Sequence, residues 1–223
     1  MPADCSINLQ LEGKLCVVVG AGHTGRRKSR LFLAAGATVR LIDPGADARE
    51  QHEHLEIRCH AYRSSDLEGA LLVVAATDRP VVNRRVATDA HRLGLLVCVA
   101  DGSAASDFTL PAVRQLGDLR LAVSSAGKSP ALSGLAADHL LNTLEPAWKT
   151  ALELAAALRV WQLTHPEQNA YNRSILRQLI DQGLIEMLST RRYERVDQLL
   201  QESCGADCTL AALGLNLPRD YDR

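Results

Sequence analysis

The sequence feature that most constrains the fold is a short apolar segment that runs directly into a glycine-rich turn. Leu15–Val19 is the apolar segment, and the first, third and sixth places of the turn are glycines: Gly20, Gly22 and Gly25. A helical pattern follows over Thr24–Ala35. The order strand, glycine turn, helix is typical of the first unit of a dinucleotide-binding α/β fold.

Each glycine would serve this turn for a different reason. Gly20 permits the tight turn, Gly22 lets a pyrophosphate approach the backbone, and Gly25 lets the helix pack closely on the strand. The free N–H groups at the start of the helix would face the anion. The alternative is a glycine-rich turn in an α/β fold that binds nothing.

An acidic residue follows the next predicted strand, Thr38–Ile42. This residue, Asp43, lies about 20 residues beyond the turn, where a carboxylate can accept hydrogen bonds from a ribose diol. No arginine follows Asp43 closely, so the 2′-phosphate of NADP would meet only negative charge. The sequence therefore predicts NAD as the cofactor.

Apolar runs and helical patterns alternate over the first hundred residues, which predicts a Rossmann-like parallel sheet with helices on both faces. The predicted strands are Ile7–Leu11, Leu15–Val19, Thr38–Ile42, Leu55–Tyr62, Ala70–Ala76 and Leu95–Ala100, and the helices are Thr24–Ala35 and Val81–Leu93. Ligands of such sheets bind beyond the carboxyl ends of the strands. Residues from four separate segments should meet at that edge: Gly20, Asp43, Thr77 and Asp101.

The pattern changes after Asp101, where short strands are followed by helices. Further strands are predicted at Phe108–Leu110 and Leu119–Val123, and helices at Pro130–Leu144, Ala147–Leu163, Glu167–Gln182 and Thr190–Gln201, with Ser129 as the N-cap before Pro130. We therefore expect three parts: an NAD-binding Rossmann domain over residues 1–112, a small α+β segment over 113–146, and a helical C-terminal domain over 147–223.

Composition argues against several classes of function. The 223 residues carry a formal net charge of -1 without a basic block, so a nucleic-acid partner is not expected. No apolar run is long enough to span a bilayer, and the first residues lack a signal-peptide pattern, so we expect a cytoplasmic protein. Cys204 and Cys208 form a close pair, but a metal site usually needs further ligands, so no metal is expected.

Asp101 is the candidate catalytic acid or base. It follows an apolar strand and precedes a loop of small residues, so beside a bound nicotinamide its carboxylate could accept a proton. The alternative is an aspartate that only caps its own loop.

Two groups of residues could bind an acidic substrate. The loop over Ser124–Pro130 offers backbone N–H groups, the hydroxyls of Ser124 and Ser125, and the charge of Lys128, although an ordinary helix-capping loop would look the same. The start of the first helix carries a basic cluster, namely Arg26, Arg27, Lys28 and Arg30. Such a cluster is either a solvated face or, in part, a set of substrate contacts, with Arg27 as the candidate.

Three motifs in this order resemble the precorrin-2 dehydrogenase family, the Rossmann module of siroheme synthase. They are VVGxGxxxxRK within Val17–Lys28, AATDxxxxN over Ala75–Asn83, and VSSxGxSP over Val123–Pro130. Leu11–Lys14 and the loop from Asp101 to Pro111 also match, and the resemblance covers about residues 7–145.

The resemblance implies an NAD-dependent oxidation of precorrin-2, a tetrapyrrole with many carboxylates, to sirohydrochlorin. It implies that Asp101 acts as acid or base, and that the segment after the Rossmann part builds a homodimer. The positions that would lie against NAD, beside the glycines and Thr77, are His23, Thr24, Asp43 and Pro44.

Some family members also insert iron into the product, and two departures bear on that activity. Cys98 stands where the family commonly has asparagine, and the helix after Pro130 lacks the usual pair of arginines. They favour a dehydrogenase alone over a bifunctional dehydrogenase and ferrochelatase. A non-catalytic NAD-sensing regulatory protein is the alternative of a different class.

Overall fold

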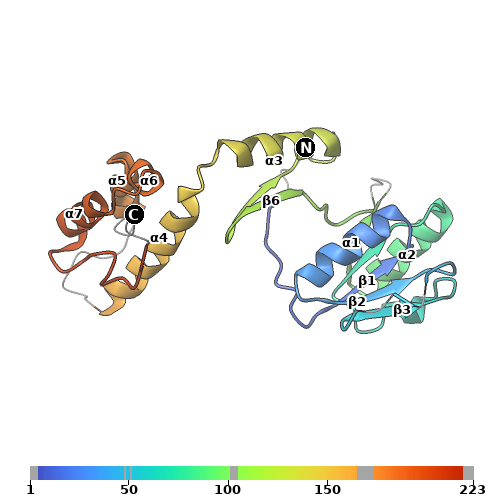
Figure 1. Ribbon diagram of the computed structural model, residues 1–223. Helices are drawn as coiled ribbons and strands as arrows, with labels where there is room; N and C mark the ends of the chain where they lie inside the picture. The colour runs from blue at the N-terminus through green and yellow to red at the C-terminus, as the bar shows by residue number, and fades with distance from the viewer. Residues whose placement is uncertain (1–4, 48, 51, 101–104, 165–172, 218–223) are drawn as a thin grey trace. The chain divides into compact units, whose positions relative to one another are not determined.

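The computed structural model describes residues 5–47, 49–50, 52–100, 105–164 and 173–217. The chain divides into two compact units, Met1–Leu110 and Pro111–Arg223, each of which is described by itself (Figure 1). No helix in the described part of the chain has the length and apolar character needed to cross a membrane.

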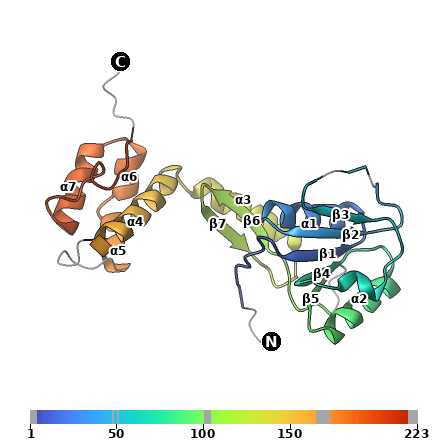
Figure 2. The same ribbon diagram turned by 90° about the horizontal axis from the view of Figure 1, so that it is seen from below.

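The first unit is a five-stranded parallel sheet with the strand order β3-β2-β1-β4-β5 (Figure 2). Its strands are β1 (Leu15–Val19), β2 (Thr38–Ile42), β3 (Leu55–Arg58), β4 (Leu72–Ala75) and β5 (Leu96–Val99). Its helices are α1 (His23–Ala34), the 3-10 helix η1 (Ser64–Leu67) and α2 (Pro80–Arg92). From β1 the chain adds β2 and β3 toward one edge of the sheet, and it then crosses back to add β4 and β5 on the other side of β1. The switch point where such sheets bind ligands therefore lies between β1 and β4.

The core lies on both faces of this sheet because side chains alternate along each strand. On one face Phe32 of α1 packs in a cluster with Val18 of β1 and Val74 of β4. On the other face Val86 of α2 packs with Val73 of β4. The central strands are thus buried on both faces, which explains their continuous apolar sequences.

Two predicted strands of this unit need correction. Ile7–Leu11 has no regular secondary structure and pairs with no strand of the described sheet. Leu11 is buried, but Ile7 and Leu9 are exposed. The third strand ends at Arg58 rather than Tyr62. Its one partner is β2, whose last residue, Ile42, is paired with Arg58.

The second unit begins with an antiparallel hairpin of β6 (Ala112–Leu116) and β7 (Leu119–Val123), followed by α3 (Pro130–Thr143). The two-residue turn contains Gly117, whose φ of 59° lies in the left-handed region. The prediction of a strand at Phe108–Leu110 is wrong. Those apolar side chains pack on the core of the first unit instead, and the strand that pairs with β7 starts after Pro111.

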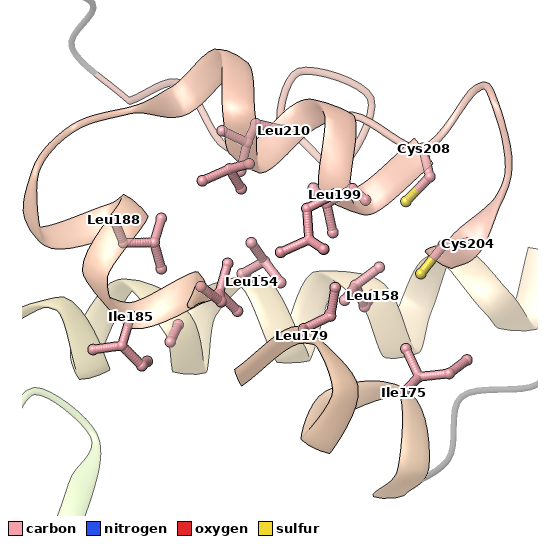
Figure 3. Close-up of a cluster of buried hydrophobic side chains, with 14 of the residues drawn as sticks. Leu154, Leu158, Ile175, Leu179, Ile185, Leu188, Leu199, Cys204, Cys208 and Leu210 are labelled. Atoms are coloured by element: carbon pink, nitrogen blue, oxygen red, sulfur yellow. The ribbon is translucent and has the colours of Figure 1, made fainter. Parts of the chain in front are cut away.

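The described part of the second unit also contains the helices α4 (Ala147–Thr164), α5 (Arg173–Asp181), α6 (Leu184–Ser189) and α7 (Tyr193–Cys204). Figure 3 shows apolar side chains from these helices, among them Leu154 and Leu179, converging on one cluster. Leu154, Leu179 and Leu200 are fully buried in this cluster. The short helix α6 was not predicted. It begins after Gly183, whose φ of 90° turns the chain sharply between two helices.

Candidate cofactor site

The glycine turn packs so tightly that two of its glycines admit no side chain. A Cβ atom on Gly25 would lie 1.8 Å from the carbonyl oxygen of Gly20, and one on Gly20 would lie 2.5 Å from that of Ala76. A Cβ atom on Gly22, by contrast, would meet nothing within 4 Å. Gly20 and Gly25 therefore hold the turn against the helix and β4, while Gly22 leaves open space above the turn.

The N-terminus of α1 follows this turn directly and has no acidic side chain of its own. Gly22 is the N-cap and supplies no side-chain cap, and the first turn, which includes His23 and Thr24, contains no acidic residue. The first N–H groups of a helix lack intrahelical partners and carry the positive end of the helix dipole. The turn therefore fits the pyrophosphate of a dinucleotide.

Asp43 joins the end of β2 to the glycine turn. Its Oδ2 accepts a hydrogen bond from the Ala21 N–H at 2.8 Å, and its Oδ1 accepts one from the Gly45 N–H at 2.7 Å. Pro44, between them, has no N–H to compete for the carboxylate. Each carboxylate oxygen can accept a second hydrogen bond, so Asp43 keeps the capacity to bind a ribose diol.

Two arginines, one in the first turn of α1 and one in the chain after β2, have acidic partners. Arg26 pairs with Glu50 and donates from Nε to the Ala21 carbonyl at 2.9 Å. Arg49 binds Asp47 at 3.0 Å, and the hydrogen bonds from Arg49 lower the pKa of the Asp47 carboxyl. Asp43 therefore offers a carboxylate to the ribose of a dinucleotide. Neither Arg26 nor Arg49 is unpaired in the described chain and free to bind a 2′-phosphate.

Thr77, after β4, is held by Asn83 of α2, a residue that our sequence prediction did not include in the site. The Asn83 Oδ1 accepts hydrogen bonds from the Thr77 N–H at 3.1 Å and the Thr77 hydroxyl at 2.7 Å. Its Nδ2 donates to the Thr77 carbonyl at 3.0 Å. Asn83 is 2% exposed, so it fixes the loop that touches Gly20. The signal for it was the asparagine at the end of AATDxxxxN.

The basic cluster on α1 is divided between surface and interior. Arg27 and Arg30 are exposed, whereas Lys28 is only 9% exposed. Burial lowers the pKa of the Lys28 ammonium, and the nearby Arg27 lowers it further, against the effect of Cys98. The cluster is therefore not a uniformly solvated face.

The loop between β7 and α3 lies in the second unit. The Ser124 hydroxyl accepts from the Ala126 N–H at 3.2 Å, and the Ser125 hydroxyl accepts from the Ser129 N–H at 3.0 Å. Ser129 caps α3 by accepting from the Leu132 N–H, which confirms the predicted N-cap. Both predicted serines thus shape the loop, Lys128 is exposed, and a role in substrate binding stays a prediction.

Asp101 lies outside the described residues, so its catalytic role stays a prediction. The described chain that follows it is anchored to β5 by two side chains. Ser106 Oγ accepts from the Val99 N–H at 2.9 Å, and Asp107 Oδ2 accepts from the Val97 N–H, also at 2.9 Å.

Within the described ranges, no three histidine, cysteine or acidic side chains gather as metal ligands do. Cys204 and Cys208 are both buried in the helical core shown in Figure 3. A hydrogen bond with Cys204, together with burial, raises the pKa of the Cys208 thiol far above its usual range. Cys204 and Cys208 therefore lie where apolar core residues lie.

Residues 7–112 match a family model described as "Putative NAD(P)-binding". This match confirms the predicted cofactor, NAD, at the level of the domain that binds it. Two of the three motifs, the glycine turn and AATDxxxxN, lie within this match, which ends where the second unit begins, and the third motif, over Val123–Pro130, lies beyond it.

Curated relatives of the chain are siroheme synthases. The siroheme synthase of Chromobacterium violaceum is 42% identical over 132 residues, which are 57% of this chain and 28% of that protein. The one from Methylococcus capsulatus is 32% identical over 206 residues, which are 90% of this chain and 43% of that protein. The chain therefore spans less than half the length of these relatives.

Among solved structures, SirC, a precorrin-2 dehydrogenase, matches with a TM-score of 0.66 at 24% identity. The match covers 88% of this chain and 98% of that one. It confirms the predicted fold class, a Rossmann-like parallel sheet followed by a small α+β segment and a helical part.

Proposed function

Because residues 7–112 belong to this NAD(P)-binding family and the chain is homologous to siroheme synthases, we propose that it oxidises precorrin-2 to sirohydrochlorin with NAD. The observation that carries the proposal is the cofactor site itself. An uncapped helix N-terminus, an open Gly22 and the Asp43 carboxylate lie together at the end of β1 and β2.

The residues of the site bind and orient the dinucleotide, which supplies hydride acceptance when bound. The N–H groups of the turn at His23 and Thr24 would hold the pyrophosphate, and Asp43 would accept from the ribose. Thr77 and the neighbouring carbonyl of Ala76 form the wall beside Gly20. Asp101 would take the proton that leaves the macrocycle as its hydride departs.

The charges around Asp43 support NAD over NADP. A 2′-phosphate would lie near Asp43, and Arg26 and Arg49 are each paired with a carboxylate of their own. Like charges brought together in a binding site cost several kcal/mol, enough for a large preference. We expect kcat/KM to favour NAD over NADP by at least about tenfold.

We also propose that the chain forms a homodimer through the second unit. α3 buries Ser133 and Ala137, whereas Leu132 and Leu135 are 62% and 67% exposed. A helix that exposes leucines in this way, beside the hairpin on which it packs, is typical of a surface covered by a second chain.

The test is anaerobic incubation with precorrin-2, with and without NAD or NADP, followed by absorption spectroscopy. NAD-dependent appearance of sirohydrochlorin is the expected result. Asp101→Asn should bind NAD with unchanged affinity but lower kcat by about 10²- to 10⁴-fold, because a positioned proton acceptor is removed. Unchanged turnover would remove Asp101 from the mechanism.

The same samples distinguish the dehydrogenase from a bifunctional enzyme and from a regulatory protein. Ferrous or cobaltous ion is added after oxidation, and faster metal insertion with protein than without would show a bifunctional enzyme. No NAD-dependent change with verified substrate would contradict the dehydrogenase and favour a regulatory protein that senses NAD.

A further inference from the structure

Two buried cysteines of the second unit are in contact at the end of α7. Cys204 is the last residue of α7 and is 4% exposed, and Cys208 is 0% exposed. Both are free thiols, and a hydrogen bond joins their side chains. Figure 3 shows the two sulfur atoms pointing toward one another. The two atoms that a disulfide would join are therefore already neighbours.

The backbone between the two cysteines is folded back on itself. Gly205, the C-cap of α7, has a φ of 110°, which lets the chain leave the helix axis sharply. The Cys208 N–H then donates to the Gly205 carbonyl at 2.9 Å and closes a turn. Cysteines form a disulfide only where the backbone brings their side chains together, and this turn meets that condition for Cys204 and Cys208.

The chain beyond the turn is held against α7 by an aspartate of that helix. The Asp197 Oδ1 accepts a hydrogen bond from the Leu210 N–H at 2.7 Å. Leu210 is itself buried in the same apolar cluster as the two cysteines. Cys208 is thus fixed from both sides, by the turn at Gly205 and by the anchor at Leu210, and its position beside Cys204 belongs to the folded unit.

The two thiols are not equivalent. The hydrogen bond from Cys208 lowers the pKa of the Cys204 thiol against the effect of burial, whereas the same contact, burial and the charge of Asp197 all raise the pKa of Cys208. The thiolate is the nucleophile in disulfide exchange, so Cys204 is the thiol that attacks first. Ala206 and Asp207 between the cysteines are exposed, so local opening of this surface turn gives a small oxidant access to Cys204.

We propose that Cys204 and Cys208 form a reversible intramolecular disulfide, with a low-molecular-weight disulfide such as glutathione disulfide as the oxidant. Cys204 attacks one sulfur of the oxidant, which forms a mixed disulfide and releases the first small thiol. Cys208 then attacks the Cys204 Sγ and releases the second. Two protein thiols are oxidised, one small disulfide is reduced to two thiols, and the two protons pass to those thiols. This modification site does not depend on the proposed function.

The test maps the cysteines of the reduced, full-length protein after incubation with excess glutathione disulfide without denaturant. The protein is then unfolded, alkylated with iodoacetamide and digested with trypsin. The tryptic peptide over residues 196–219 contains Cys204 and Cys208 and no other cysteine. This peptide should be lighter than its reduced form by the mass of two hydrogen atoms and should take up no alkylating agent. Dithiothreitol should restore both alkylation sites.

The other cysteines and two single variants serve as controls. Cys59 is exposed and should gain glutathione, whereas Cys16, which is 0% exposed in β1, should stay unmodified. Cys208→Ala should keep glutathione on Cys204, because the resolving thiol is missing. Cys204→Ala should react at Cys208 at least about tenfold more slowly than Cys208→Ala reacts at Cys204, because Cys208 is the poorer nucleophile.

Three results would overturn the proposal. In the wild type, alkylation of both cysteines would show that no disulfide forms, and glutathione retained on Cys204 would show that Cys208 cannot reach it. Modification of Cys16 together with the pair would show that the exchange passes through unfolded protein. Equal reaction rates in the two variants would overturn Cys204 as the nucleophile. The test uses neither NAD nor precorrin-2, so its failure leaves the proposed dehydrogenase activity untouched.

Discussion

At the scale of single residues, the three glycines of one turn have separable functions. Gly25 is required for close packing of α1 on β1, because its missing Cβ makes room for the Gly20 carbonyl. Gly22 is not required for packing, since a side chain there would meet no atom within 4 Å, and its φ of -68° suits any residue. Its function is to keep open the space in which the pyrophosphate would lie.

This difference predicts opposite effects of two substitutions. Gly25→Ala should destabilise the fold by about 3 kcal/mol or more, because the added methyl group cannot be accommodated between backbone atoms. Gly22→Asp should fold normally, since aspartate is a favourable N-cap, yet lose NAD affinity by at least about a hundredfold through like charge at the pyrophosphate. Urea unfolding and calorimetric titration with NAD measure the two effects. NAD affinity retained in Gly22→Asp would mean that the cofactor binds elsewhere.

At the scale of elements, the site depends on a contact between the loop after β4 and the first turn of α2. Asn83 makes three hydrogen bonds to Thr77, and the Ala76 and Thr77 backbone in turn contacts Gly20. The loop is therefore preformed by a buried side chain from the next helix. A cofactor that binds a preformed loop loses less free energy to ordering.

Asn83→Ala should break this arrangement. We expect a loss of about 1 to 3 kcal/mol in unfolding free energy, because the part-buried polar groups of Thr77 lose their partners, and about tenfold weaker NAD binding. Asn83→Asp is the control that keeps the Oδ acceptor but not the donor, and it should bind NAD with intermediate affinity. Equal NAD affinity in all three proteins would show that the loop needs no support from α2.

At the scale of the whole molecule, the second unit carries the surface proposed for dimerisation. Sedimentation should show a dimer for the wild type and a monomer for the double variant Leu132→Asp with Leu135→Asp, because the charges would have to be buried in the interface. Leu163→Asp is the control, because Leu163 lies in α4, outside the α3 surface proposed for the interface, and its substitution should not affect assembly. A wild-type monomer would contradict the proposed dimer, and an unchanged dimer in the double variant would place the interface elsewhere.

The sequence by itself determined the structural features that depend on residues close together along the chain. β1 and β2 have the predicted bounds, and Ser129 caps α3 as expected, because an apolar run, a glycine spacing and a capping hydroxyl act within a few residues. The same local signals correctly predicted the Rossmann-like fold, and they also gave the candidate residues of the cofactor site.

The tertiary structure decided what depends on partners distant in sequence. Phe108–Leu110 is apolar enough for a strand, but a strand needs a neighbour, and only the chain after Pro111 pairs with β7. Lysine is usually found at the surface, yet the packing of α1 against β1, β2 and β4 leaves Lys28 only 9% exposed. Pairing and burial are properties of the assembled fold, so neither can be read from a residue and its immediate neighbours.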